Sequence, residues 1–172
     1  EVVSEQKRID LPQMTEPVKA IFVDPRQQWL YVINGRALAD VFSLRDNSLN
    51  GRYKLLEDGS AEITASTQLV GGISLIVGDS KGGLAQWFMA RDPDGEQHLK
   101  QIRTFQMGST PVVEITAEER RKGFTALDAS GNFGVFHSTA HRTLLVDPVV
   151  EGQGIFGMSP RANRVIVEAG GK

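Results

Sequence analysis

A glycine-containing hairpin turn recurs along this chain at nearly constant spacing, and few folds accommodate such a repeat. In its clearest copy, an alternating segment from Ile73 to Val77 leads through a glycine-rich turn into a second segment from Leu84 to Met89. Glycines end such strands and supply the positive-φ positions of hairpin turns. The turn glycines of four copies align, with separations of 47, 49 and 40 residues, at Gly35, Gly82, Gly131 and Gly171. The sequence therefore predicts a tandem repeat built around one hairpin.

Each repeat contains four short segments with strand-like patterns, in the same order. In the first repeat they are Val18–Asp24, Trp29–Ile33, Ala37–Leu44 and Arg52–Glu57. In the second repeat the hairpin is flanked by Ile63–Val70 and Leu99–Gln106. In the third they are Val112–Thr116, Gly123–Asp128, Phe133–Ser138 and Thr143–Val149, and a fourth repeat begins with Ile155–Met158 and Arg164–Glu168. Pro148 indicates an outer or edge strand, because proline cannot donate to a sheet ladder.

A period of 40 to 50 residues with four strands in each repeat predicts the blades of a β-propeller. We expect an all-β fold of about three and a half four-stranded blades, within a single soluble domain at 1–172. The expected blades are 15–59, 60–108, 109–152 and a partial blade at 153–172, with the outer strand of a preceding blade at 1–11. The alternative is a β-sandwich, which shares the strand alternation but not the regular period.

Three and a half blades do not close a ring, because closed propellers have about four to eight. The terminal blades would expose unpaired strand edges, and such edges are sites of association. We therefore expect either that the N-terminal strand completes a ring or that two copies of the chain pair.

Charge and composition narrow the classes of function. The 19 Lys and Arg residues are outnumbered by 21 Asp and Glu, so no basic face is expected and nucleic acid is not a predicted partner. Cysteine is absent, which excludes disulfides and thiol chemistry. No apolar run approaches the roughly 20 residues that span a bilayer, and the chain starts at Glu1 without a leader. We expect an excised part of a larger protein.

Two clusters have the residue types of a binding site but lack the required spacing. His137 and His141 fall on a strand end and its turn without a third ligand, so structural histidines are the preferred interpretation. His98 lies in a polar turn and indicates no site. Residues 78–83 contain Lys81 and three glycines but lack the phosphate-loop spacing and a following helix. Turn chemistry accounts for this segment.

The other polar and aromatic candidates also have structural explanations. Asp79 and Asp128 occupy matching places before their turns, where carboxylates cap backbone N–H groups more often than they do acid–base work. Trp87 is expected in the core, and the charged run Glu118–Lys122 in a solvated loop. No Ser-His-acid arrangement can be singled out. The sequence therefore predicts no catalytic, cofactor-binding or metal-ligating residue, and a protein that is not an enzyme.

Three longer segments are distinctive in their sequence as a whole: QKRIDLPQMTEPVKAIFVDPRQQWLYVINGRA, GDSKGGLAQWFMARD and GQGIFGMSPRANRVIVEAGGK. Together they resemble the long form of the permease subunit of the phosphate-specific (Pst) ABC transporter of Gram-negative bacteria. The likeness covers Gln6 to Lys172. In that family a first transmembrane helix is followed by a large soluble insertion that is WD40-like. This chain is similar to the latter half of the insertion.

The resemblance implies a role in importing inorganic phosphate, with this domain on the periplasmic face of the bacterial inner membrane. The implied partners are the periplasmic phosphate-binding protein and, through the parent protein, the second permease and the cytoplasmic ATPase. No transport residue of the family falls within this chain. We therefore expect a non-catalytic docking or regulatory platform.

Two other functions stay open at this point. One is a phosphate-sensing domain that uses Lys81, Arg36 and turn amides along the propeller axis. The other is a generic WD40-like scaffold for protein interactions. A propeller enzyme ranks last, because the sequence shows no cluster of acids for a metal and no cofactor site.

Overall fold

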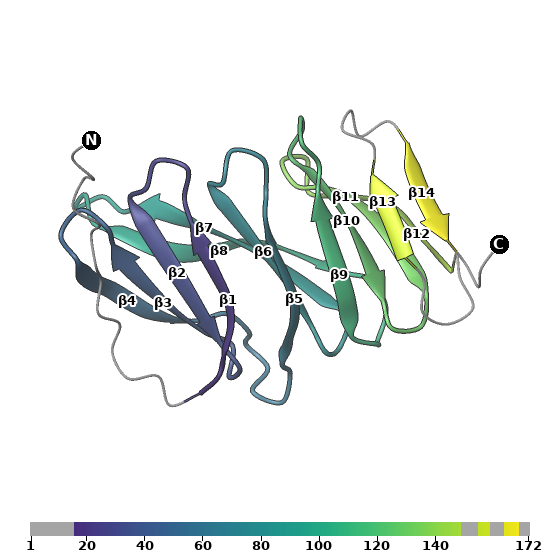
Figure 1. The fold of residues 1–172 in the computed structure, drawn as a ribbon, viewed down its shortest axis with the longest axis horizontal. Coiled ribbons are helices and arrows are strands. Elements are labelled where there is room, and N and C mark those ends of the chain that lie inside the picture. Colours follow the sequence, from purple (N-terminus) through teal and green to yellow (C-terminus); the bar gives the residue numbers. More distant parts are fainter. Residues whose placement is uncertain (1–15, 149–154, 159–163, 169–172) are drawn as a thin grey trace, which may run out of the picture.

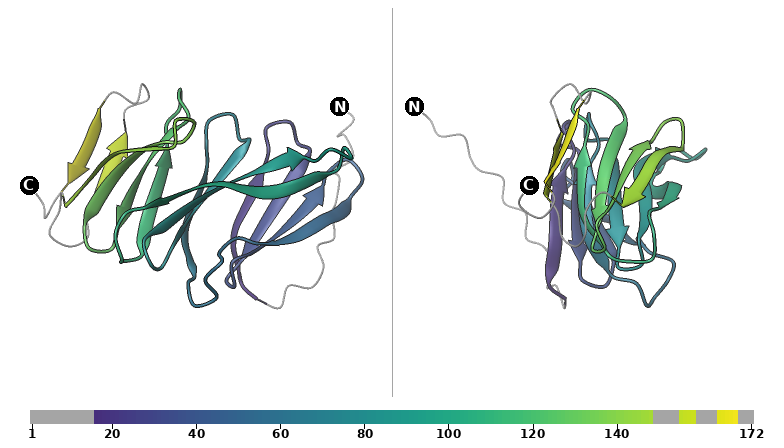
Figure 2. Two further views of the ribbon diagram at one scale, coloured as in Figure 1. Left: turned by 180° about the vertical axis from the view of Figure 1, so that it is seen from behind. Right: turned by 90° about the vertical axis from the view of Figure 1, so that its right-hand side faces the viewer.

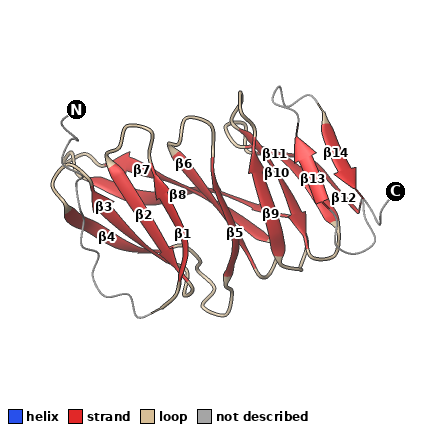
Figure 3. Ribbon diagram, viewed as in Figure 1, coloured by secondary structure: helices blue, strands red, loops and turns tan. Residues whose placement is uncertain are grey.

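The computed structural model describes residues 16–148, 155–158 and 164–168, and these contain β-strands and no helix (Figure 3). This part of the chain accordingly has no helix that could cross a membrane. The strands form three four-stranded sheets and one two-stranded sheet, and all paired strands are antiparallel. The all-β prediction is confirmed.

Each four-stranded sheet is one blade, and its strands follow chain order across the sheet. Blade 1 consists of β1 (Val18–Val23), β2 (Trp29–Asn34), β3 (Leu38–Ser43) and β4 (Ser48–Lys54). Blade 2 consists of β5 (Ile63–Gln68), β6 (Ser74–Asp79), β7 (Gly83–Arg91) and β8 (Gln97–Gln106). Blade 3 consists of β9 (Val112–Ala117), β10 (Gly123–Asp128), β11 (Asn132–His137) and β12 (Arg142–Pro148). The partial blade has β13 (Ile155–Met158) and β14 (Val165–Glu168).

The blades lie side by side along the long axis of the molecule, from blade 1 at one end to the partial blade at the other (Figure 1). The chain leaves each blade from its last strand and enters the next blade at its first strand, and β5 lies against β9. Figure 2 shows the same succession from behind and from one end. This arrangement is that of propeller blades and differs from the two facing sheets of a sandwich.

Two apolar cores fill the spaces between neighbouring blades, which we call seam 1–2 and seam 2–3. Strand β6 contributes to both, because Leu75 and Val77 belong to the core of seam 1–2 whereas Ile76 belongs to the core of seam 2–3. The reason is that successive side chains of a strand point to opposite faces of the sheet. Blade 2 is therefore buried on both faces and depends on both neighbours.

The hairpin turn after the second strand of each blade is a three-residue loop capped by a polar side chain. Asn34, Asp79 and Asp128 each accept hydrogen bonds from the backbone N–H groups two and four residues later. The third loop residue has positive φ in each case, at Ala37 (58°), Gly82 (79°) and Gly131 (87°). Three-residue hairpin loops combine a type I turn with one residue in this left-handed conformation.

The prediction that Gly35 occupies the matching position in blade 1 is wrong, since the positive φ belongs to Ala37. The Asn34-Gly35 pair favours a two-residue turn. Instead, the Asn34 side chain accepts the N–H groups of Arg36 and Leu38 and so holds a three-residue loop. Counted from Ala37 to Gly82, the first period is 45 residues rather than 47, which still fits a blade.

The outermost strand of blade 1 differs from its predicted bounds. Strand β4 begins at Ser48, four residues before the predicted Arg52, and most of its side chains are exposed or half-buried. An outer strand faces solvent, so its apolar pattern is weak. Pro148 lies in β12 at the edge of blade 3, as predicted. The expected strand at 1–11 and the turn glycine Gly171 lie outside the described residues.

Candidate functional site

Seam 2–3 changes character along its length. One end is aromatic: Phe105 of β8 meets Phe124 and Phe136 of blade 3 edge-on, at centroid distances of 5.5 and 5.3 Å. Phe124 and Phe136 stack on each other at 5.0 Å, and both are fully buried. Aromatic packing of this kind stabilises beyond simple burial of area. This end holds the two blades together.

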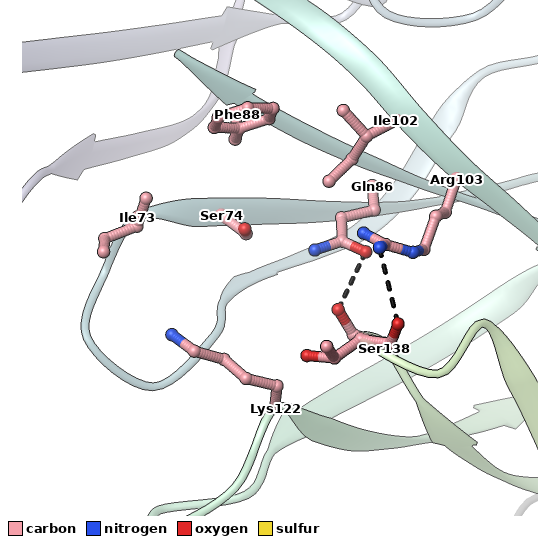
Figure 4. Close-up of a pocket in the computed structure, with 9 residues that line it drawn as sticks. Ile73, Ser74, Gln86, Phe88, Ile102, Arg103, Lys122 and Ser138 are labelled. Carbon is pink, nitrogen blue, oxygen red and sulfur yellow. Dashed lines mark hydrogen bonds between the residues drawn. The ribbon is translucent and has the colours of Figure 1, made fainter. Parts of the chain in front are cut away.

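The other end of seam 2–3 is polar and opens into a cavity of about 440 Å³, which we call the interblade groove (Figure 4). Its polar lining comes from blade 2 and from two turns of blade 3: Ser74, Gln86, Arg103, Lys122, Ser138 and Thr139. Gln86 of β7 and Arg103 of β8 are cross-strand partners and share one face of the sheet. The apolar wall consists of Ile73, Phe88 and Ile102.

A buried amide lies at the base of the interblade groove. Gln86 is 3% exposed and Ser138 is 2% exposed. The Ser138 hydroxyl donates to Gln86 Oε1 across the seam at 2.8 Å. The Gln86 amide N–H groups have no acceptor among the described residues, and Figure 4 shows the amide nitrogen turned from Ser138 toward the side of Lys122. The groove therefore contains a free hydrogen-bond donor on a side chain that is otherwise buried.

Two cations flank this amide. The Lys122 ammonium donates to the Val70 carbonyl of blade 2 at 2.6 Å, which fixes its position and leaves two N–H groups. Arg103 Nη2 makes one long contact, 3.5 Å, to the Thr139 carbonyl. No carboxylate among the described residues pairs with either cation, and no Asp or Glu lines the groove. The groove is rich in donors and carries positive charge, so its chemistry favours an anion.

The matching carboxylates Asp79 and Asp128 cap their own turns, as the preferred interpretation predicts. Asp79 Oδ1 accepts from the N–H groups of Lys81 and Gly83 at 2.7 and 2.9 Å. Asp128 is fully buried and accepts from both the backbone and the side chain of Asn132. Burial raises the pKa of Asp128, but the combined hydrogen bonds from Asn132 and its neighbours outweigh burial and hold the pKa below its usual value.

The cations singled out for a phosphate-sensing site lie outside the interblade groove and have partners. Lys81 pairs with Asp58 at 2.6 Å and Arg36 with Glu16 at 2.6 Å. The hydrogen bond from Lys81 holds the pKa of Asp58 well below its usual range. The amides of the 78–83 turn are also occupied, because Asp79 accepts two of them. This turn therefore offers no free phosphate cradle.

The histidines have local partners. His141 Nε2 lies 2.9 Å from the Thr104 carbonyl, with its ring edge-on to Phe105. His137 Nδ1 accepts the Ala140 N–H at 3.2 Å. Within the described part of the chain, no three His, Cys, Asp or Glu side chains are grouped as metal ligands would be.

The structure confirms the predicted place of Trp87 but only part of the prediction for the charged run 118–122. Trp87 is 8% exposed in the core of seam 1–2, as predicted, and its Nε1 has no hydrogen-bond partner among the described residues. Residues 119–121 are exposed, as expected of a solvated loop. Glu118 and Lys122 differ from this expectation, because both are half-buried. Glu118 Oε2 is buried without a hydrogen-bond partner among the described residues, and Lys122 bonds to blade 2. The sequence did not single out Lys122, because it ends a run of acidic and basic residues. The usable signal was Gln86, a polar residue in a strand whose neighbours are apolar.

Comparison with known proteins identifies the fold. The sequence matches no protein-family model and no curated protein sequence. A structure of U3-55K superposes with a TM-score of 0.66 at 10% identity, over 84% of this chain and 43% of that one. A crystal structure of RRP9 WD40 repeats superposes with a TM-score of 0.63 at 11% identity, over 79% of this chain and 40% of that one. The fold is a partial WD40-like β-propeller. The chain spans about two fifths of the length of these two structures.

Proposed function

We propose that this chain is a non-catalytic docking module whose interblade groove receives part of a partner protein. The observation that carries the proposal is the groove itself, where a buried amide donor and two cations stand beside an apolar wall. Recognition sites combine an apolar lining with a few placed polar groups in this way. The Ser138 hydroxyl donates to Gln86 rather than to a base, so it is not an activated nucleophile.

The setting of phosphate import belongs to the same proposal and is supported by the resemblance of three long segments to the Pst permease. In that setting the domain lies in the periplasm on an inner-membrane permease. It docks the periplasmic phosphate-binding protein or a second copy of itself. The ATPase and the second permease are then partners of the parent protein. A second copy has an available surface on blade 1, where Ile21 and Val23 are 56% and 45% exposed.

A binding assay between this domain and the purified phosphate-binding protein tests the proposal, with and without phosphate. We expect a saturable complex that the Lys122→Gln substitution weakens. No complex in either condition at about 100 μM would contradict docking of this partner. Light scattering over a concentration series tests pairing of two copies, and a monomer at every concentration would count against it.

Direct phosphate sensing is a second candidate, and it is favoured by Arg103 and Lys122 rather than by Lys81 and Arg36. Calorimetry with inorganic phosphate separates the candidates. Heat that disappears in Arg103→Gln would favour sensing, whereas no heat would leave docking as the function. Binding to proteins other than the phosphate-binding protein would favour a generic WD40-like scaffold.

A further inference from the structure

We infer that the interblade groove binds an acidic segment of a partner protein, with a Glu or Asp carboxylate on Gln86, Arg103 and Lys122 and an aliphatic neighbour on the wall beside them. This inference rests on the proposed docking function and names the chemistry of the docked segment. Three independent features carry it: the unused donors, the absence of acids from the lining, and the exposed apolar wall.

The unused donors are the first feature. Gln86 is almost entirely buried, yet its amide N–H groups have no acceptor among the described residues. The amide nitrogen itself is not among the fully buried atoms that lack a partner, so it reaches the open groove and is accessible to an acceptor from outside. Lys122 and Arg103 add further N–H groups on two sides of the cavity (Figure 4). A carboxylate accepts several hydrogen bonds at once and donates none, which matches this set of donors.

Charge is the second feature. This chain has more acidic than basic residues, but no Asp or Glu of its described part lines the groove. Three other cations of the described chain, Arg36, Arg52 and Lys81, each pair with a carboxylate of the chain. Arg103 and Lys122 have no such partner among the residues that the structure covers. A partner carboxylate would find two cations together in the groove lining and no acid beside them.

The apolar wall is the third feature, and it distinguishes a peptide from a small inorganic anion. Ile73 is 53% exposed and Ile102 is 37% exposed. The cavity of about 440 Å³ holds several side chains and is far larger than one phosphate ion needs. A free phosphate would leave the isoleucines in water, whereas an extended peptide places an aliphatic side chain near its carboxylate. Burial of these isoleucines then adds to the affinity.

The experiment titrates the full chain with the peptide acetyl-Leu-Glu-Leu-Glu-Leu-amide and follows the Gln86 side-chain amide by NMR. We expect saturable shifts of that amide and at least tenfold weaker binding in Arg103→Gln and in Lys122→Gln. Lys54→Gln is the matched control, because the Lys54 ammonium also donates to a main-chain carbonyl but lies outside the groove. It should bind like the unaltered chain. The peptide with Gln in place of both Glu residues should bind at least tenfold more weakly.

Three outcomes would overturn the inference: equal binding of the Glu and Gln peptides, equal loss in Lys54→Gln, or saturation by inorganic phosphate without any response to the peptide. The result is separable from the proposed docking function. If the phosphate-binding protein binds the unaltered chain and the Arg103→Gln and Lys122→Gln variants equally, the docking function is supported but the groove is not the docking site. If the peptide binds as expected but the phosphate-binding protein does not, the groove does bind acidic segments and its partner is another protein.

Discussion

The two seams of this array are built differently, although blade 2 supplies one face of each. Seam 1–2 has a continuous apolar core that includes Trp87, and Asn50 Nδ2 bonds across it to the Gln97 carbonyl at 3.0 Å. Seam 2–3 is aromatic at one end only. At its other end Lys122 and Ser138 bond across to blade 2 around a cavity. Seam 1–2 also borders a smaller cavity, of about 240 Å³, but its lining includes both Asp24 and Arg26. The cavity of seam 2–3 has two cations and no carboxylate among its described lining residues, and this is the difference between the two seams.

The largest effects should come from truncating the apolar anchors of either seam. Phe124→Ala and Trp87→Ala each remove a large buried side chain, so each should lower the free energy of unfolding by about 3–5 kcal/mol. Chemical denaturation of both variants measures this. Phe124→Ala also loses two ring contacts and should be at least as damaging. An unchanged melting temperature for Trp87→Ala would show that seam 1–2 is not packed as described.

The next largest effect should come from the hairpin turn of blade 2 that contacts the segment between β8 and β9. Gly82 has φ of 79°, and a Cβ there would lie 2.6 Å from the Gly108 carbonyl oxygen. Gly82→Ala should therefore cost about 2–4 kcal/mol, from the left-handed backbone and the overlap together. Gly59→Ala is the control, since nothing lies within 4 Å of its Cβ, and it should stay within about 0.5 kcal/mol. Equal losses in the two variants would contradict the close contact.

The buried cap beside seam 2–3 should make stability depend on pH. The pKa of Asp128 is lowered in the folded state, so its stabilisation is present above its unfolded pKa of about 3.9 and is lost as pH falls through the folded value. Asp128→Ala should cost about 2 kcal/mol at neutral pH. Urea denaturation between pH 7 and pH 2 should show a shallower decline for Asp128→Asn than for the unaltered chain. Parallel declines would refute the role of this carboxylate.

The smallest effects should come from the polar end of seam 2–3. Ser138→Ala leaves the buried Gln86 oxygen without its donor and should cost about 1 kcal/mol. Gln86→Leu/Ser138→Ala replaces both partners by apolar groups and should be within about 1 kcal/mol of the unaltered chain. Denaturation of the single and double variants measures their coupling. A loss in the double variant that equals the sum of the single losses would mean that the two side chains act independently.

The sequence was sufficient for the blades but not for the groove, and the reason is physical. Blade strands such as Gly123–Asp128 were placed without error, because alternation and turn residues are local properties of the chain. The groove depends on residues from different blades: Gln86 and Lys122 become neighbours only when the sheets pack. Lys122 lay in a run of mixed charge and gave no local signal. Gly35 does not match Gly82 and Gly131, because the Asn34 side chain accepts two backbone N–H groups and so holds a three-residue loop where the sequence indicates a two-residue turn.

The affinity of Gln86→Leu/Ser138→Ala for the Glu-containing peptide tests most directly whether the polar end of seam 2–3 exists for recognition. If it does, the double variant stays folded with nearly unchanged stability and binds the peptide at least tenfold more weakly, because the amide donor to the carboxylate is gone. A folded double variant that binds the peptide as tightly as the unaltered chain would contradict the account.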